Sequence, residues 1–411
     1  MSFLKKAVLA MLEKEELAAW CAPLRMARNL LDWKRAKPAL RECRRIVVIR
    51  PDEIGDVLLT SAFFRSLRKS APAAHITAIT NEICRPLLEN CPYVDLVLAL
   101  PFKPTIECEH RALLVVATIK LKLARLCRGF DLVLLPRGDA DWYNAELVGH
   151  LLVGRGSLVS NTAAFIEWTI KPPESPRLAD WRYEVVTPQS DVLSNLEFLS
   201  WCGGEIQGIG LEFWTAIEDE SFAKNWLGVG KVGSRKLVFH PPSGSHHLKR
   251  WPMGRSQKFI LRLLAETDFE VIIIGGPGEE WVRNEISSIN NPRIRLAFNA
   301  FNLTKLGAVI RECGYFVGGD SGPMHIAAAV GAKVLGIFGY ASETRFRPWS
   351  ENAEVVSLRY HCSPDQRGTY EANCQKCIYP ENRCLTELSV DKVMSEIQSF
   401  FCEDERVVKR G

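Results

Sequence analysis

Short apolar runs alternate with segments of helical spacing along most of the chain. In the first half, the runs are RIVVIR, HITAIT, VDLVLAL and FDLVLLP, at 45–50, 75–80, 94–100 and 130–136. Their apolar residues are continuous, as in strands of a parallel sheet that is covered on both faces. Residues 57–69, after the first run, have the spacing of a helix. Repeated strand–helix units predict a doubly wound α/β domain.

The same pattern restarts in the second half, after a less regular stretch at 155–235 that contains a helix predicted near 191–201. The later runs are at 237–241, 270–276, 294–298, 315–320 and 333–339. We therefore predict two Rossmann-like domains. The predicted parts are a helical extension (1–43), a first domain (44–185), a connection (186–235), a second domain (236–390) with a cysteine-rich loop (361–384), and a C-terminal helix (390–411).

The extension is amphipathic and basic. Its apolar residues recur at helical spacing from Phe3 to Leu12, and residues 1–45 carry 11 Lys and Arg against 5 Asp and Glu. This surplus of +6 exceeds the net charge of +4 of the whole chain. Two interpretations stay open: the helix docks on the neighbouring domain, or it lies on an anionic membrane surface. Glu13, Glu15 and Glu16 favour docking. The low net charge argues against a nucleic-acid partner.

No run reaches the roughly 18 apolar residues of a membrane span. The first apolar run is interrupted by charges at 13–16, unlike a signal peptide, so we expect a cytoplasmic protein. Thirteen cysteines are then expected to be thiols or metal ligands rather than disulfides. Four of them have the spacing C-x11-C-x2-C-x6-C: Cys362, Cys374, Cys377 and Cys384. They are expected either to bind a structural zinc or iron ion or to remain reduced thiols. The other cysteines are expected to be small buried residues.

The turn after the first predicted strand carries candidate chemistry. Ligands of open parallel sheets bind at the carboxyl ends of the strands, where residues 51–56 would lie. Asp56 falls at the start of the next helix, where its carboxylate either caps the helix or faces a ligand. Asp52 is open to the same two interpretations.

The first strand of the second domain leads into HPPSGSHHLKRWP, at 240–252. Ser243, Gly244 and Ser245 are small, so backbone N–H groups can approach an anion there. Lys249 and Arg250 add positive charge, which suits a diphosphate. The alternative is that both cations are solvated surface groups.

The most specific motif is GGDSGPMH, at 318–325. Pro323 fits the first turn of a helix, so N–H groups near Ser321 and Gly322 would point toward a phosphate, with His325 beside them. Asp320 either holds a ribose or caps the helix. A further glycine-rich strand end, GGPGEE, places Glu279 where it either accepts from ribose hydroxyls or sits in the first turn of a helix.

The chain resembles glycosyltransferase family 9, the ADP-heptose:lipopolysaccharide heptosyltransferases and their relatives. The resemblance lies in four motifs that occur in the family's order: RPDEIGDVLLTSAFFRSLR, SGSHHLKRWP, GGPGEE and GDSGPMHIAAAVG. The resemblance covers about residues 44–400. It implies a GT-B fold, in which two Rossmann-like domains face a cleft, and an inverting transfer without a catalytic metal. The donor would be a nucleotide sugar such as ADP-heptose. The acceptor would be an anionic, lipid-linked glycan at the inner face of the inner membrane, where the protein would be peripheral.

The resemblance also implies roles for single residues. Asp56 matches the general base, and Lys249 matches a lysine near the diphosphate. Arg50 and Asp52 belong to the acceptor-side motif. The remaining matches bind the nucleotide sugar: Ser243, Gly244, Ser245, Arg250, Glu279, Asp320, Ser321, Gly322 and His325. Two alternatives to transfer are a nucleotide-sugar epimerase of GT-B architecture and a non-catalytic protein that binds nucleotide sugars.

Overall fold

The chain folds into two compact units, Met1–Ile209 and Gly210–Gly411. The division falls inside the segment 186–235 that was predicted as the connection. The computed structural model describes residues 39–103, 108–125, 129–136, 143–153, 156–163, 178–186, 189–228, 235–243, 247–366 and 377–401. The predicted extension therefore lies almost wholly outside the described residues, apart from a short 3-10 helix at Leu40–Glu42.

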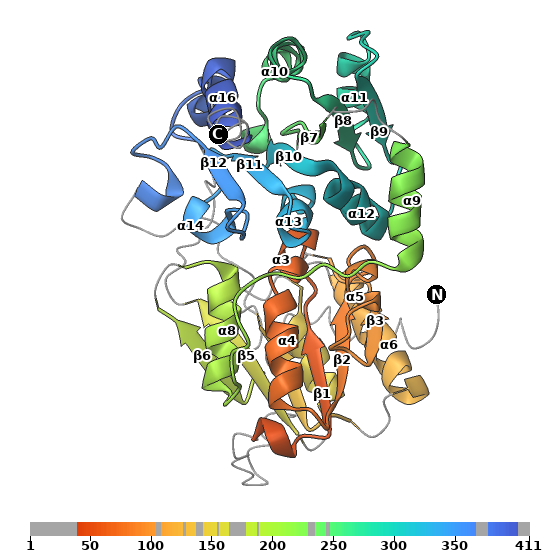
Figure 1. The fold of residues 1–411 in the computed structure, drawn as a ribbon. Coiled ribbons are helices and arrows are strands. Elements are labelled where there is room, and N and C mark those ends of the chain that lie inside the picture. The colour runs from red at the N-terminus through yellow and green to blue at the C-terminus, as the bar shows by residue number, and fades with distance from the viewer. Residues whose placement is uncertain are drawn as a thin grey trace, which may run out of the picture. The chain divides into compact units, whose positions relative to one another are not determined.

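The first unit is built on a parallel six-stranded sheet of order β3-β2-β1-β4-β5-β6 (Figure 1). Its strands are β1 (Arg45–Ile49), β2 (His75–Thr80), β3 (Leu96–Ala99), β4 (Leu132–Leu135), β5 (Ser157–Ala163) and β6 (Trp181–Val185). Val47 of β1 pairs with Thr77 on one side and Val133 on the other. Its helices are α3 (Ile54–Leu58), α4 (Ser61–Ser70), α5 (Pro86–Glu89), α6 (Cys108–Arg125), α7 (Ala145–Leu152) and α8 (Asp191–Trp201).

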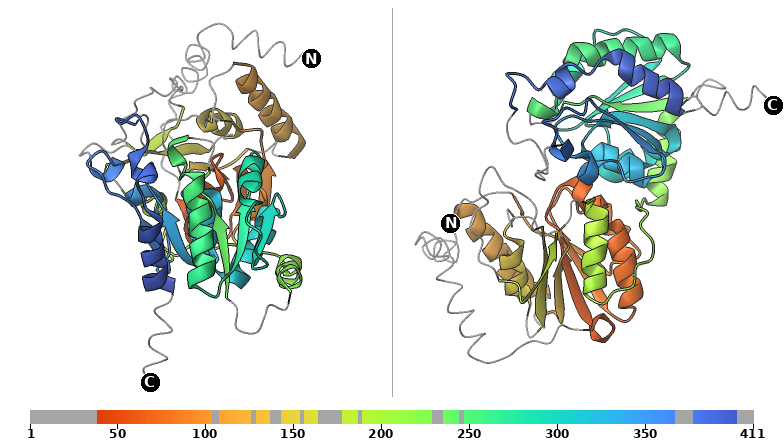
Figure 2. Two further views of the ribbon diagram at one scale, coloured as in Figure 1. Left: turned by 90° about the horizontal axis from the view of Figure 1, so that it is seen from above. Right: turned by 90° about the vertical axis from the view of Figure 1, so that its left-hand side faces the viewer.

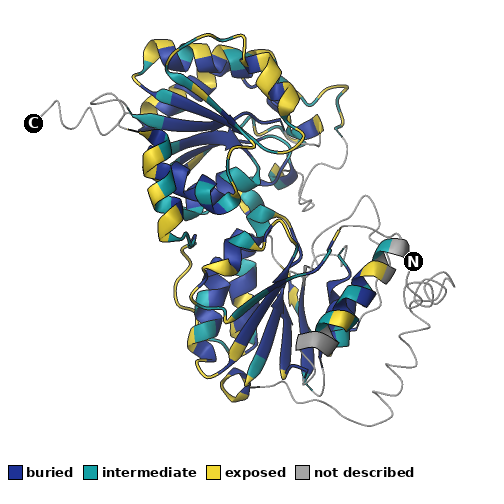
Figure 3. Cartoon of the chain, turned by 90° about the vertical axis from the view of Figure 1, so that its right-hand side faces the viewer, coloured by how far each residue is buried: buried dark blue, intermediate teal, exposed yellow. Residues whose placement is uncertain are grey.

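Helices cover both faces of this sheet. Helices α4 and α8 pack together on one face, and α6 and α7 pack together on the other (Figure 2). The central strands β1, β2 and β4 are buried almost throughout (Figure 3). Burial on both sides explains why the central strands read as continuous apolar runs in the sequence.

The second unit repeats this topology with the order β12-β11-β10-β7-β8-β9. Its strands are β7 (Lys236–His240), β8 (Glu270–Gly275), β9 (Ile294–Phe298), β10 (Gly314–Gly319), β11 (Lys333–Ile337) and β12 (Ala353–Val356). Its main helices are α9 (Ile217–Leu227), α10 (Met253–Glu266), α11 (Glu280–Ile286), α12 (Leu303–Cys313), α13 (Gly322–Ala329) and α16 (Val390–Glu396). Helix α10 packs against α11 and α16, whereas α12 packs against α9 and α13 (Figure 1).

Shorter turns complete the second unit. They are α14 (Glu343–Phe346), α15 (Arg383–Thr386), 3-10 turns at His247–Lys249 and Pro364–Gln366, and a π turn at Ile397–Phe401 that continues α16. The predicted C-terminal helix thus begins at Val390 as expected, and residues 402–411 lie outside the described residues.

Each predicted apolar run forms a strand, but three strands were not predicted. Strand β5 carries the buried polar residues Ser160 and Asn161, which interrupt its apolar pattern. Asn161 donates to the carbonyl oxygen of Pro136 at 2.8 Å, so its burial is satisfied by a hydrogen bond. Strand β6 lies at the edge of the described sheet, next to β5, and β12 has only four residues.

The single helix predicted over 57–69 is wrong, because the structure has two helices. Helix α3 begins earlier, at Ile54, and ends at Leu58. The Thr60 hydroxyl donates to the carbonyl oxygen of Asp56 at 2.9 Å, and Arg50 donates to the same oxygen at 3.0 Å. With this oxygen taken by two side chains, the chain turns at Thr60 and α4 starts at Ser61.

The described part of the chain contains no helix that is both long and apolar enough to span a bilayer. Of the cysteines expected to be buried, five are buried in the structure: Cys43, Cys84, Cys91, Cys202 and Cys313. Burial raises the pKa of the Cys43 thiol to about 11 and that of Cys313 to about 12.

Candidate functional site

Neighbouring strands of the second unit bring the predicted phosphate and ribose residues to one edge of its sheet. Strands β10, β7 and β8 are adjacent and parallel, so their carboxyl ends meet at this edge. His240 ends β7, Asp320 follows β10, and Glu279 follows the turn after β8. Gly319 permits the close approach: a Cβ atom added there would lie 2.9 Å from Cβ of Pro242. The sequence motifs therefore converge as the strand-end rule predicts.

Glu279 is the centre of one hydrogen-bonded cluster. Its Oε2 atom lies 3.1 Å from Nε2 of His240 and accepts from the backbone N–H of Gly276 at 2.7 Å. Its Oε1 atom accepts a short hydrogen bond from the Ser243 hydroxyl. On its other side, His240 Nδ1 lies 3.1 Å from the Ser321 hydroxyl oxygen. The predicted phosphate loop is thus connected to the predicted ribose residue through His240.

This cluster holds Glu279 as a carboxylate. Burial alone would raise the pKa of Glu279, but the hydrogen bond and charge of His240, with the donors Ser243 and Gly276, lower it to about 2. A carboxylate offers about four acceptor positions, and three are used here. The remaining position can accept a ligand hydroxyl.

A second cluster joins Lys249, Asp320 and His325. Lys249 Nζ donates to Oδ2 of Asp320 at 2.8 Å, and His325 Nε2 lies 3.9 Å from Oδ1. Burial would raise the pKa of Asp320, but the Lys249 charge and the His325 interactions lower it to about 2. Asp320 is therefore ionised and oriented between two potential cations.

Helix α13 begins directly beside this cluster. Its N-cap is Ser321 and Pro323 lies in its first turn, but no described side chain hydrogen-bonds to cap it. His325 is 3% exposed, and its Nδ1 atom has no hydrogen-bond partner within the described ranges. Unpaired N–H groups at a helix start and a buried, unsatisfied imidazole nitrogen together form a site that can take an anion.

Three further residues of the predicted nucleotide-sugar set are not placed in either cluster. Arg250 is exposed, and its guanidinium lies 5.4 Å from the ring centre of Trp281. Gly244 and Ser245 lie outside the described residues. The structure therefore brings together Ser243, Lys249, Glu279, Asp320, Ser321, Gly322 and His325 of the predicted set.

In the first unit, Asp56 occupies the third position of α3 and takes part in a capping box. Its Oδ2 atom accepts from the backbone N–H of Glu53 at 3.3 Å. The carboxylate of Asp56, which is half-buried, thus caps α3. Its second interpretation from the sequence, a residue that faces a ligand, stays a prediction.

Arg50 lies beneath this turn and is 1% exposed. Its Nη1 atom lies 3.4 Å from Oδ2 of Asp52, and its Nη2 atom lies 3.9 Å from Oδ2 of Asp191 in α8. Its guanidinium also donates to the carbonyl oxygen of Asp56. In this structure Arg50 contacts the protein rather than solvent, so it positions the Asp56 turn.

His240 and Asp191 were not predicted from the sequence. His240 was read only as part of the loop motif at 240–252, although it ends a strand directly before that loop. Its partners Ser321 and Glu279 are 81 and 39 residues away in the chain, so its role depends on the sheet order. Asp191 follows its helix cap, Ser190, and gave no separate signal.

Three of the four predicted metal-binding cysteines lie near the candidate site. Cys362, Cys377 and Cys384 line one small cavity together with Tyr340, whose ring centre lies 5.7 Å from Lys249 Nζ. Cys374 lies outside the described residues. Among the residues that the structure describes, no three His, Cys, Asp or Glu side chains are grouped to hold a metal ion.

Comparisons with known proteins agree with the resemblance in the motifs. Residues 207–375 match the model of glycosyltransferase family 9 (heptosyltransferase). The lipooligosaccharide heptosyltransferase 2 of Campylobacter jejuni subsp. jejuni serotype O:6 is 30% identical over 175 residues, which are 41% of this chain and 52% of that protein. That alignment spans about half of the relative's length.

Longer alignments have lower identity. The lipopolysaccharide heptosyltransferase 2 of Salmonella typhimurium is 22% identical over 373 residues, covering 88% of this chain and 99% of that protein. The solved structure of Escherichia coli ADP-heptose lipopolysaccharide heptosyltransferase II superposes with a TM-score of 0.65 at 18% identity, covering 88% of this chain and 99% of that one. The two parallel sheets with their helices thus form the GT-B fold that the resemblance implied.

Proposed function

Because this chain belongs to glycosyltransferase family 9, we propose that it transfers heptose from ADP-heptose to a lipopolysaccharide inner-core glycan or a related acceptor, with inversion at the transferred carbon. The observation that carries the proposal is the cluster of Lys249, Asp320 and His325 at the uncapped start of α13. This combination of a cation, a buried imidazole and free N–H groups suits a diphosphate that gains negative charge as the sugar departs.

The second unit would hold the donor. In this proposal Lys249 and the N–H groups at Ser321 and Gly322 bind the diphosphate, and His325 adds a hydrogen bond. Glu279, ionised and with one acceptor position left, binds a ribose hydroxyl. Ser243 and His240 orient Glu279, since both hydrogen-bond to its carboxylate. Arg250, Gly244 and Ser245 complete the positive, N–H-rich loop.

The first unit would supply the base. Asp56 takes the proton of the acceptor hydroxyl as that oxygen attacks the sugar carbon, and the bond from this carbon to the diphosphate breaks. Arg50 and Asp52 hold the Asp56 turn on the acceptor side. The positive groups of the second unit then stabilise the departing diphosphate, so the step as proposed needs no catalytic metal.

A structural metal and a membrane attachment, neither of which takes part in the transfer step, complete the proposal. The four cysteines of the 361–384 loop hold a structural zinc or iron. The basic residues 1–43 attach a cytoplasmic protein to the inner face of the inner membrane, where a lipid-linked anionic acceptor is found.

Product analysis with a panel of nucleotide sugars and purified acceptor glycans tests the function. We expect ADP-heptose to yield a glycan heavier by one heptose, together with one ADP. Release of free or isomerised sugar without an acceptor would instead identify an epimerase. Nucleotide-sugar binding without turnover across many acceptors would identify a binding protein.

A further inference from the structure

Residues 377–388, where the chain returns from the cysteine-rich loop, are anchored in the second unit. We call them the return segment. Leu385 and Leu388 are 2% and 0% exposed and belong to the hydrophobic core of this unit. Leu385 also packs closely against the end of β11, because a Cβ atom added to Gly339 would lie 2.8 Å from its Cγ atom. Apolar packing therefore fixes the place of the return segment.

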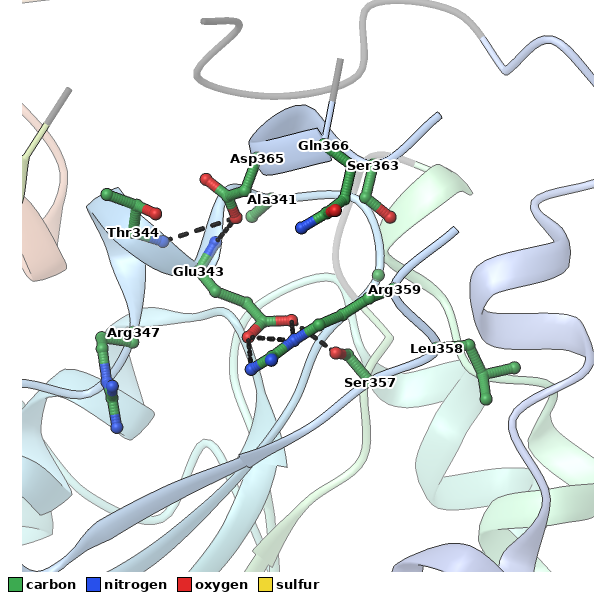
Figure 4. A pocket seen from close by; sticks show the side chains of 11 residues that line it. Ala341, Glu343, Thr344, Arg347, Ser357, Leu358, Arg359, Ser363, Asp365 and Gln366 are labelled. Carbon is green, nitrogen blue, oxygen red and sulfur yellow. Dashed lines mark hydrogen bonds and ion pairs between the residues drawn. The ribbon is translucent and has the colours of Figure 1, made fainter. Parts of the chain in front are cut away.

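The chain that enters the cysteine-rich loop is held as well. Arg359 donates to the carboxylate of Glu343, in α14, at 2.8 Å (Figure 4). Asp365 accepts from the backbone N–H of Glu343 at 2.7 Å (Figure 4). The Tyr360 hydroxyl joins the two ends of the loop, because it donates to Glu387 of the return segment. Both ends of the loop are thus attached to the same unit.

Asn382 reaches from the return segment to the loop that carries Lys249. It is the N-cap residue of α15, yet its side chain makes no capping hydrogen bond to a described residue. Instead, its Nδ2 atom donates to the carbonyl oxygen of Leu248 at 3.2 Å and to that of Arg250 at 3.3 Å. These residues directly precede and follow Lys249. One planar amide, with two N–H groups, therefore holds the backbone on both sides of Lys249.

A further contact holds the same loop two residues after Lys249. Trp251 is 1% exposed, and its Nε1 atom donates to the carbonyl oxygen of Leu388 at 3.0 Å. Leu248 is buried too, and it lines a small cavity together with Asn382. The backbone around Lys249 is therefore held by residues 132 to 137 positions later in the chain than their partners.

A fixed backbone restricts where the Lys249 ammonium can lie. Lysine carries its charge on a flexible four-carbon stem, so a displaced backbone displaces the charge. The Lys249 side chain is 33% exposed, and its Nζ atom donates to Asp320 at 2.8 Å. In a partly exposed ion pair, the entropy lost in ordering the side chains offsets much of the attraction. A backbone that is held in advance reduces this loss, for Asp320 and for a bound anion alike.

We propose that Asn382 is a positioning residue for Lys249. Its amide fixes the backbone so that the ammonium faces Asp320 and, in the proposed function, the diphosphate of the donor. The role at the diphosphate rests on the proposed function, whereas the effect on the contact between Lys249 and Asp320 rests on the hydrogen bonds of Asn382 alone. Asn382 itself contacts neither the substrate nor the reacting atoms.

The first experiment measures ADP binding to the full chain by calorimetric titration. Asn382→Ala and Asn382→Asp both remove the two N–H donors, and Asn382→Asp keeps the shape of the side chain. We expect both variants to bind ADP about three- to tenfold more weakly than wild type, which is the size of one hydrogen bond. An affinity within twofold of wild type for either variant would overturn the proposal.

Ser389→Ala is the matched control for this experiment. The Ser389 hydroxyl accepts from the backbone N–H of Lys392 at 3.2 Å and caps α16, directly after the return segment. Its removal costs a helix cap in the same part of the chain without touching the Lys249 loop. We expect its ADP affinity to stay within twofold of wild type. A loss as large as that of Asn382→Ala would attribute both effects to general destabilisation and would overturn the proposal.

The second experiment tests whether Asn382 acts through Lys249. Asn382→Ala is combined with Lys249→Met, and ADP binding is compared with that of Lys249→Met alone. The added substitution should then weaken binding by less than twofold, because no ammonium is left to position. A further loss of twofold or more would mean that Asn382 acts on the site by another route, which would overturn the proposal.

The third experiment needs no ligand. A double-mutant cycle of urea unfolding gives the coupling between Lys249 and Asp320, and the cycle is repeated with Asn382→Ala present. We expect the coupling to fall to less than half, and an unchanged coupling would overturn the positioning of Lys249. If wild type binds no ADP while the coupling still depends on Asn382, the proposed function fails and the positioning role of Asn382 stands.

Discussion

Removing the contact between Lys249 and Asp320 tests the candidate donor site most directly. Replacing Lys249 with Met removes the charge and keeps most of the aliphatic stem. Among the described residues, Asp320 then keeps His325, at 3.9 Å, as its one potential cationic partner. An ionised carboxylate beside the start of α13 would also oppose a diphosphate there. Two separate quantities should change: the coupling between the two residues, and the affinity for ADP.

The lowered pKa of Asp320 gives the size of the coupling free energy between Lys249 and Asp320. The difference between its ordinary value of 3.8 and about 2 corresponds, at about 1.36 kcal/mol per pKa unit, to about 2.4 kcal/mol in favour of the carboxylate. Lys249 and His325 share this preference, so the coupling of Lys249 to Asp320 should be about 1–2 kcal/mol. For ADP, one lost charge-assisted hydrogen bond is worth roughly 1.5–3 kcal/mol, a decrease in affinity of about 10- to 150-fold.

A double-mutant cycle with Lys249→Met, Asp320→Asn and the double variant measures the coupling from urea unfolding at pH 7. Calorimetric titration with ADP gives the affinities of the same proteins. Lys258→Met is the control, because Lys258 is an exposed lysine on α10. A coupling below about 0.3 kcal/mol, together with an ADP affinity of Lys249→Met within twofold of wild type, would refute the proposed roles of both residues.

Four further predictions address the base, the acid stability, the metal and the extension. Asp56→Asn should abolish transfer while ADP binding stays unchanged; near-normal turnover would remove Asp56 as the base. Because the pKa of Glu279 is depressed from 4.5 to about 2, its carboxylate stabilises the folded protein fully above pH 4.5. This contribution is lost as the pH falls through about 2. Glu279→Gln should therefore cost about 3 kcal/mol of unfolding free energy at pH 7 and about 2 kcal/mol less at pH 3, whereas an equal cost at both values would contradict the assignment. Purified protein should hold one zinc or iron that chelators remove, and less than about half an equivalent would exclude a structural metal at Cys362, Cys374, Cys377 and Cys384. The full chain should float with anionic liposomes and a chain that begins near Arg44 should not, so equal flotation would contradict membrane binding by the extension.

The central strands could be predicted because the physics that forms them acts locally. A strand covered on both faces must be apolar throughout, so β1, β2, β7 and β8 are evident in the sequence. Strand β5 could not be found in this way. Its buried Asn161 is acceptable only because it can donate to Pro136 and to Ser194, from α8, and both lie far along the chain.

The candidate site likewise contains residues that could be predicted from the sequence and residues that could not. Residues at strand ends were predictable, since parallel strands bring their carboxyl ends together whatever the intervening sequence. His240 was not, because its two ring nitrogens find Ser321 and Glu279 only after β7 is inserted between β10 and β8. The turn at Thr60 depends likewise on a buried guanidinium from the preceding strand end.

The buried pairing of Arg50 with Asp191 bears on where this protein can be divided. A fragment that stops at residue 185 would omit α8, so the guanidinium would lose one carboxylate and the apolar surface of α4 would face water. Removing one partner of a buried ion pair typically costs about 3–5 kcal/mol, a large share of the stability of a small domain. A fragment that contains the first unit should therefore extend to Ile209, so that it includes α8 and the pairing of Arg50 with Asp191.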